Sequence, residues 1–128
     1  LQDQLVEATS FNDWFYGTEL SALDPEKINI GVFNPTSAEI LNIDSRIDFK
    51  LFYVNVSDKE RLLRQLNRES NPDVDEIIRR FPKDKADFLD IDVDYINLDN
   101  ENIEDFTMAP YVLINHLLLS GWLPRGFE

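Results

Sequence analysis

One junction constrains the fold of this chain more than any other: an apolar run ends where a strong helix start begins. The run Lys50–Val56 is rich in β-branched and aromatic residues and predicts a strand. Ser57 follows at once, and Ser57 with Glu60 forms the pattern of a capping box, which predicts a helix over 58–68. A strand that leads directly into a helix is typical of crossover units, which build mainly parallel sheets flanked by helices.

The same alternation of strand and helix patterns continues along the chain. We expect a strand within 1–8 or a helix end there, a turn at Asn12–Asp13, a short helix over 18–23 capped by Thr18, a buried parallel strand over 28–33, and a helix over 36–42. After 58–68 we expect a helix over 73–81 that Pro82 kinks or ends, and a second helical segment over 83–89. A strand over 92–98 follows, and then a last helical region capped by Asn102, broken or bent near Pro110 and stopped by Gly121. The pattern predicts an α/β protein.

Composition excludes several classes of site. The 128 residues contain no cysteine and one histidine, so neither a disulfide framework nor a thiolate or His-rich metal site is expected. The net charge of −13 disfavours direct binding to nucleic acid, which requires clustered Lys and Arg. No charged-then-apolar leader and no long apolar run is present, so we expect no membrane span and a soluble, cytoplasmic protein.

The stretch over 5–18, L-V-E-A-T-S-F-N-D-W-F-Y-G-T, sets an acid at Glu7, a phenol at Tyr16 and a hydroxyl at Thr18. This stretch resembles the acceptor motif of guanylate kinases, in which an acid and a Ser/Thr hold the guanine base and a Tyr holds the GMP phosphate. The resemblance implies that Glu7, Tyr16 and Thr18 bind a nucleoside monophosphate. The plainer alternative is an exposed Glu beside a β-turn.

The resemblance extends over most of the chain and implies a partial three-layer fold of the P-loop kinase type. It divides the single domain 1–128 into an acceptor region at about 1–24, a core at 25–66 and 90–128, and a lid at about 67–89. It implies that Arg68 and Arg80 clamp phosphates catalytically, where guanidinium forks stabilise the charge of the transferring group. The alternative for these arginines is a solvated helix face paired with acids.

Two departures from the family pattern bear on function. Asn34 stands where the family has an Asp that contacts the base; because an amide both donates and accepts, the preferred base is left open. No G-x-x-x-x-G-K-S/T loop occurs in the 128 residues, so the ATP and Mg²⁺ that the resemblance implies have no binding loop here. Catalysis is therefore expected only if such a loop lies upstream.

Three functions remain open from the sequence. The first is a guanylate kinase-like nucleotide kinase, and the second is a non-catalytic module of that type that binds a protein or phosphopeptide. The third is an acidic decoy that occupies a DNA-handling protein through the acidic residues Asp84, Asp87, Asp90, Asp92 and Asp94. A Ca²⁺ site on the last three of these, and a basic catalyst at His116, are weaker alternatives because the EF-hand glycine and glutamate are missing and His116 lies in an apolar helix pattern.

Overall fold

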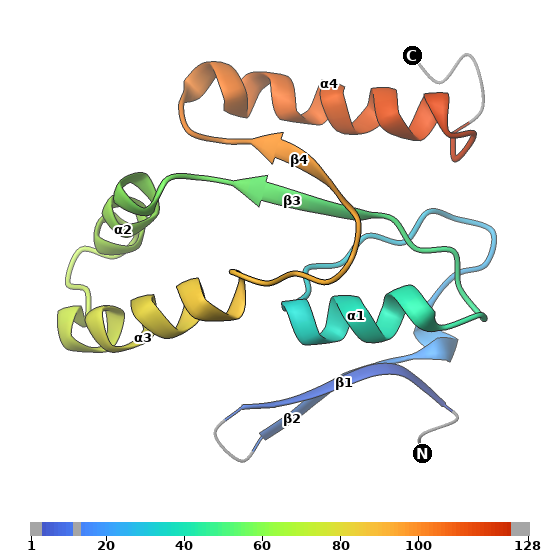
Figure 1. Ribbon diagram of the computed structural model, residues 1–128, viewed down its shortest axis with the longest axis horizontal. Helices are drawn as coiled ribbons and strands as arrows, with labels where there is room; N and C mark the ends of the chain where they lie inside the picture. Colours follow the sequence, from blue (N-terminus) through green and yellow to red (C-terminus); the bar gives the residue numbers. More distant parts are fainter. Residues whose placement is uncertain (1–3, 12–13, 124–128) are drawn as a thin grey trace. The chain divides into compact units, whose positions relative to one another are not determined.

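The computed structural model describes residues 4–11 and 14–123, and within them the protein is a mixed α/β structure (Figure 1). Its elements, in order, are β1 (Leu5–Phe11), β2 (Trp14–Glu19), the 3₁₀ helix η1 (Leu20–Ala22), α1 (Pro35–Ile43), β3 (Leu51–Asn55), α2 (Asp58–Asn67), α3 (Val74–Asp87), β4 (Tyr95–Asp99) and α4 (Ile103–Leu119). None of the helices in these described residues is long and apolar enough to cross a membrane.

The chain forms two compact units, of which the first comprises Leu1–Leu51 and Ile91–Asp94. Its sheet is the antiparallel hairpin β1–β2, in which Glu7 pairs with Thr18. Helix α1 packs on β1, and the interface is made by small and branched side chains: Val6 and Ala38 are 2% exposed and Leu41 is 4% exposed. This packing places the middle of β1 beside the first turn of α1.

The second unit comprises Phe52–Asp90 and Tyr95–Glu128. Its two strands, β3 and β4, lie side by side and run in the same direction, with α4 along β4 (Figure 1). Leu98 on β4 and Leu117 on α4 are the buried apolar residues of this packing, at 6% and 7% exposed. Helices α2 and α3 follow β3 and pack on each other.

Helix starts agree with the sequence, because short polar side chains satisfy the first free amides of four helices. Asn34, Ser57, Asp73 and Asn102 each accept a hydrogen bond from the backbone amide three residues later. The capping box at Ser57 is only half formed, however. The carboxylate of Glu60 binds Arg64, and the amide of Ser57 donates instead to Glu101.

Four sequence expectations are corrected. Thr18 caps no helix, because it lies in β2 and η1 begins two residues later. The segment 28–33 forms no strand, although its composition favours one. Helix α3 runs unbroken through Pro82 and α4 through Pro110. The sheet is also not mainly parallel, because β1–β2 is antiparallel and β3–β4 is a separate parallel pair.

The end of α4 follows the sequence prediction. Gly121 has φ = 79°, a backbone conformation that favours glycine. The amides of Gly121 and Trp122 donate to the carbonyls of Leu118 and Leu117, which closes the helix in a Schellman-like turn. The expected turn at Asn12–Asp13 lies outside the described residues.

Candidate functional site

A hydrogen-bonded carboxylate lies at the centre of the first unit. Glu7, in the middle of β1, is 8% exposed. Its Oε1 accepts a hydrogen bond from the hydroxyl of Thr18 on β2 at 2.7 Å, and its Oε2 accepts one from the hydroxyl of Ser37 on α1 at 2.7 Å. Two of the residues predicted from the acceptor motif, Glu7 and Thr18, are therefore in direct contact.

Asn34 joins the same cluster through Ser37. The Oδ1 of Asn34 accepts from the backbone amide of Ser37 at 2.8 Å, so the amide side chain is also the N-cap of α1. Ser37 itself is 2% exposed and was missed in the sequence. Its position gave a usable signal, because the residue three after an N-cap lies on the same first turn of the helix.

Tyr16 lies on the same hairpin, two residues before Thr18 in β2. Because side chains alternate along a strand, Tyr16 and Thr18 share one face of the hairpin. Tyr16 is 56% exposed, so its phenol is open to solvent. All four residues predicted to bind substrate thus belong to the first unit.

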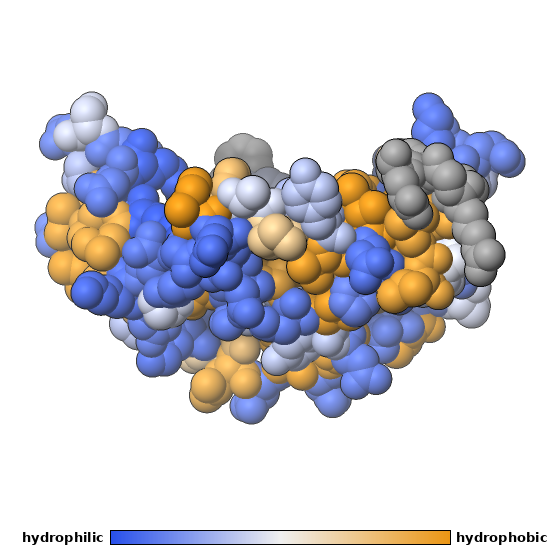
Figure 2. Space-filling model, turned by 90° about the horizontal axis from the view of Figure 1, so that it is seen from above, coloured by the Kyte–Doolittle hydropathy of each residue, from blue (hydrophilic) through white to orange (hydrophobic). Residues whose placement is uncertain are grey.

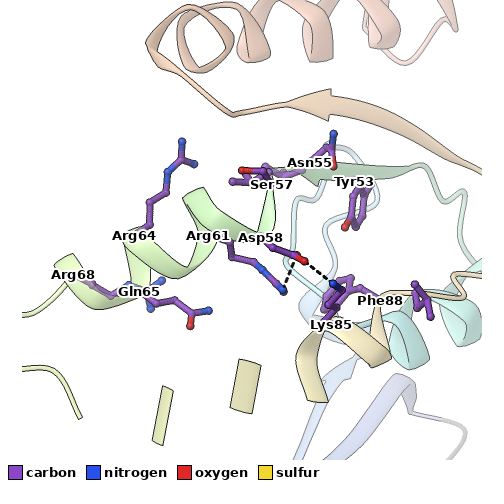
Figure 3. Close-up of a pocket in the computed structure, with 13 residues that line it drawn as sticks. Tyr53, Asn55, Ser57, Asp58, Arg61, Arg64, Gln65, Arg68, Lys85 and Phe88 are labelled. Atoms are coloured by element: carbon purple, nitrogen blue, oxygen red, sulfur yellow. Dashed lines mark hydrogen bonds and ion pairs between the residues drawn. The ribbon is translucent and has the colours of Figure 1, made fainter. Parts of the chain in front are cut away.

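The second unit carries a groove of about 440 Å³ that is lined by four of the twelve Lys and Arg residues of an acidic chain. It is formed by residues from the end of β3, from α2 and from the end of α3 (Figure 3). Among its lining residues the only acid is Asp58, whereas four are basic: Arg61, Arg64, Arg68 and Lys85. The groove therefore favours an anion in a protein whose net charge is −13.

Two of these four cations are held by Asp58. Its carboxylate binds Lys85 at 2.6 Å and Arg61 at 3.2 Å, and both side chains point toward it in Figure 3. The hydrogen bond from Lys85, followed by the charges of Lys85 and Arg61, holds the pKa of Asp58 below its usual range. The guanidinium of Arg61 also lies 4.2 Å from the ring centre of Phe81 on α3.

Arg64 and Arg79 have structural partners. Arg64 donates to Glu60 and to the carbonyls of Asn100 and Glu101, which ties α2 to the end of β4. Arg79 pairs with Glu76 at 2.6 Å on the surface of α3. The hydrogen bond from Arg79 lowers the pKa of Glu76, and the more distant charge of Arg80 adds to this effect.

The two arginines predicted to be catalytic differ in position. Arg68 is the C-cap of α2 and lines the groove, and within the described part of the chain it forms no hydrogen bond or ion pair. Arg80 lies in α3 and is not among the residues that line the groove. The structure therefore places Arg68, and not Arg80, in a basic groove.

The alternative sites weighed from the sequence gain little support. Across residues 4–11 and 14–123, no group of three or more His, Asp or Glu side chains is arranged to hold a metal ion, and this includes Asp90, Asp92 and Asp94. His116 packs edge-on against Phe52, with ring centres 6.2 Å apart.

Comparison with known protein families, with curated proteins and with solved structures finds no match to this chain.

Proposed function

We propose that this chain is the acceptor and lid part of a nucleoside monophosphate kinase of the guanylate kinase type, with a partial P-loop kinase fold. In this proposal the first unit binds the base and phosphate of the acceptor nucleotide through Glu7, Tyr16, Thr18 and Asn34. Arg68, in the groove of the second unit, is proposed separately to bind a phosphate group. Arg80 is kept in the proposal only as a residue of the lid helix.

The observation that carries the proposal is the environment of Glu7. A buried carboxylate is costly to desolvate, and apolar residues hold a helix on a sheet at lower cost. Here a carboxylate occupies the interface of β1 and α1, with a hydroxyl donor on each oxygen. A carboxylate has about four acceptor positions, so roughly two remain for a ligand.

The remaining acceptor positions suit a base with two adjacent N–H donors. The N1–H and N2–H₂ groups of guanine form such a pair, and charge-assisted hydrogen bonds to a fixed carboxylate are among the strongest in proteins. Because Thr18 is only half-buried, we expect the base to enter beside it. The amide of Asn34 either donates or accepts, so bases other than guanine are compatible with this site.

Transfer of phosphate is not assigned to these residues alone. The Mg²⁺ and ATP that the resemblance implies require backbone amides, a Lys and a Ser/Thr in a phosphate-binding loop, and no such loop occurs in the 128 residues. The residues present therefore do not fit Mg·ATP, and no catalytic step is derived through it. The groove with Arg68 fits a phosphate without a metal.

The experiment compares nucleotide affinity between matched variants by isothermal titration calorimetry with GMP, dGMP, AMP, CMP and dTMP. Glu7→Gln keeps the shape and removes the charge, and we expect it to weaken GMP binding by roughly ten- to a hundredfold, as for loss of one charge-assisted hydrogen bond. Glu39→Gln, on the exposed side of α1, is the matched control and should leave affinity unchanged. Equal affinities in both variants would exclude Glu7 from the site.

A binding module without catalysis is the second candidate, and the basic groove favours it. The same groove suits the phosphate of a phosphopeptide as well as that of a nucleotide. A phosphoserine peptide that binds more tightly than any monophosphate, with loss of binding in Arg68→Ala, would support the module and exclude the kinase proposal.

A further inference from the structure

The segment 28–33, which leads into α1, has the composition of a strand and the structure of a coil (Figure 1). Ile30 is 86% exposed and Val32 is 99% exposed, the highest exposure of any large apolar residue in the described chain. In the described part of the chain, residues 30–33 form no backbone hydrogen bonds. Apolar side chains and an unpaired backbone are thus open to solvent in the same short segment.

Such a segment is unusual because exposed large apolar residues normally occur singly on soluble proteins. Figure 2 shows other groups of orange residues at the surface, and α4 exposes Ile103, Phe106 and Tyr111. Those residues of α4 belong to a hydrogen-bonded helix, whereas residues 30–33 also have a backbone that is unpaired within the described chain. In 28–33 the β-branched residues Ile28, Ile30 and Val32 alternate, as along one face of a strand, and Phe33 supplies an apolar group on the other. The face with Ile28, Ile30 and Val32 is therefore suited to burial in a sheet.

We infer that residues 28–33 are a docking edge for a β-strand of a polypeptide outside residues 1–128, one with β-branched residues and a net positive charge. Pairing with a strand satisfies the backbone and buries Ile30 and Val32 together, which a helix in a groove does not do. The charge follows from that of the chain, because a net charge of −13 attracts a basic partner. A second copy would bring another −13 to the contact and be repelled.

The inference is independent of the proposed nucleotide site, since none of residues 28–33 contacts Glu7, Thr18 or Ser37 through a hydrogen bond. Loss of nucleotide binding would leave the docking edge in place, and the reverse also holds. The two are therefore tested separately.

The test uses a ten-residue peptide of alternating Val and Lys with blocked ends, added to the whole chain. Backbone amide hydrogen exchange is followed by NMR or mass spectrometry. We expect exchange at alternate amides within residues 30–33 to slow by about tenfold or more when the peptide is bound, because only those amides face the added strand. A peptide of the same sequence, N-methylated at every residue, has equal charge but no backbone N–H to donate at either edge, and it should give no protection.

Variants separate strand pairing from attraction by charge. Val32→Asp should abolish the protection, whereas Ile43→Asp, at the end of α1 and 82% exposed, should retain it. Equal protection by the N-methylated peptide, or its persistence in Val32→Asp, would overturn the inference. So would protection that grows with protein concentration in the absence of peptide, because the occupant would then be a second copy.

Discussion

Removal of the Ser37 hydroxyl tests the most buried polar contact of the structure. In Ser37→Ala the Oε2 of Glu7 loses its 2.7 Å donor while the carboxylate stays 8% exposed. Hydrogen bonds to charged groups contribute about 1.5–3 kcal/mol, so we expect the free energy of unfolding to fall by about that amount. Replacing a helical Ser by Ala regains up to about 0.5 kcal/mol of helix propensity, which reduces the observed loss.

The neighbouring Thr36 provides the control for helix propensity. Thr36 is exposed in the same turn of α1, so Thr36→Ala should change stability by no more than about 0.5 kcal/mol. Urea unfolding followed by circular dichroism measures both variants under the same conditions. The difference between them isolates the contact between Ser37 and Glu7.

A double-mutant cycle with Glu7→Gln completes the test. If the contact is present, the losses in Ser37→Ala and Glu7→Gln are not additive, and the coupling exceeds the ~0.5 kcal/mol seen between independent sites. Losses that add within that limit would refute the placement of Glu7 against α1. So would a Ser37→Ala variant no less stable than Thr36→Ala.

Three further predictions concern α1. Asn34→Ala removes the N-cap and should lower the free energy of unfolding by about 0.5–2 kcal/mol in urea titrations, and retention of full stability would argue against the cap. Leu41 is 4% exposed, so Leu41→Ala should lower the free energy of unfolding in urea by about 2–5 kcal/mol, whereas Ile40, at 38% exposed, should lose clearly less on replacement by Ala. Equal losses of stability in the two variants would contradict the packing of α1. The hydrogen bonds from Arg46 lower the pKa of Asp44 to about 2, so the Asp44 carboxylate stabilises the fold above its unfolded pKa and this contribution is lost as pH falls toward 2. The difference in the free energy of unfolding between wild type and Asp44→Asn should therefore shrink between pH 5 and pH 2. A difference that stays constant over this range would exclude the contact between Asp44 and Arg46.

The parts of the fold that the sequence predicts are those set by local chemistry. The strand before Ser57 and the starts of α2 and α4 were found within a few residues, because capping side chains and β-branched runs act through their immediate neighbours. The stop at Gly121 was found for the same reason. These signals need no knowledge of tertiary packing.

The parts that were missed depend on partners distant in the sequence. Thr18 was assigned to a helix because it precedes an acid, but pairing with β1 places it in a strand. The run 28–33 was assigned to a strand by composition, and no strand within residues 4–11 and 14–123 pairs with it. Pro82 was expected to kink or end a helix, and α3 does not end there but continues through it, with Arg61 of α2 stacked on Phe81 at that turn.

The candidate site was predicted in part. The motif at 5–18 named Glu7 and Thr18 as binding residues, a role that stays a prediction. Their contact, and that of Glu7 with Ser37, thirty residues later, come from the structure. Arg68 was identified among five arginines of similar helical context, and it differs from Arg64 and Arg79 because, within the described residues, it forms no hydrogen bond or ion pair. Spacing alone does not show which arginines already have partners.

The most direct test of the account is a titration of the ¹⁵N-labelled protein with GMP, followed by NMR. We predict saturable shifts in the amide signals of Glu7, Tyr16, Thr18 and Asn34. No shift at millimolar GMP, or shifts confined to the groove of the second unit, would contradict the assignment of the first unit as an acceptor-nucleotide site.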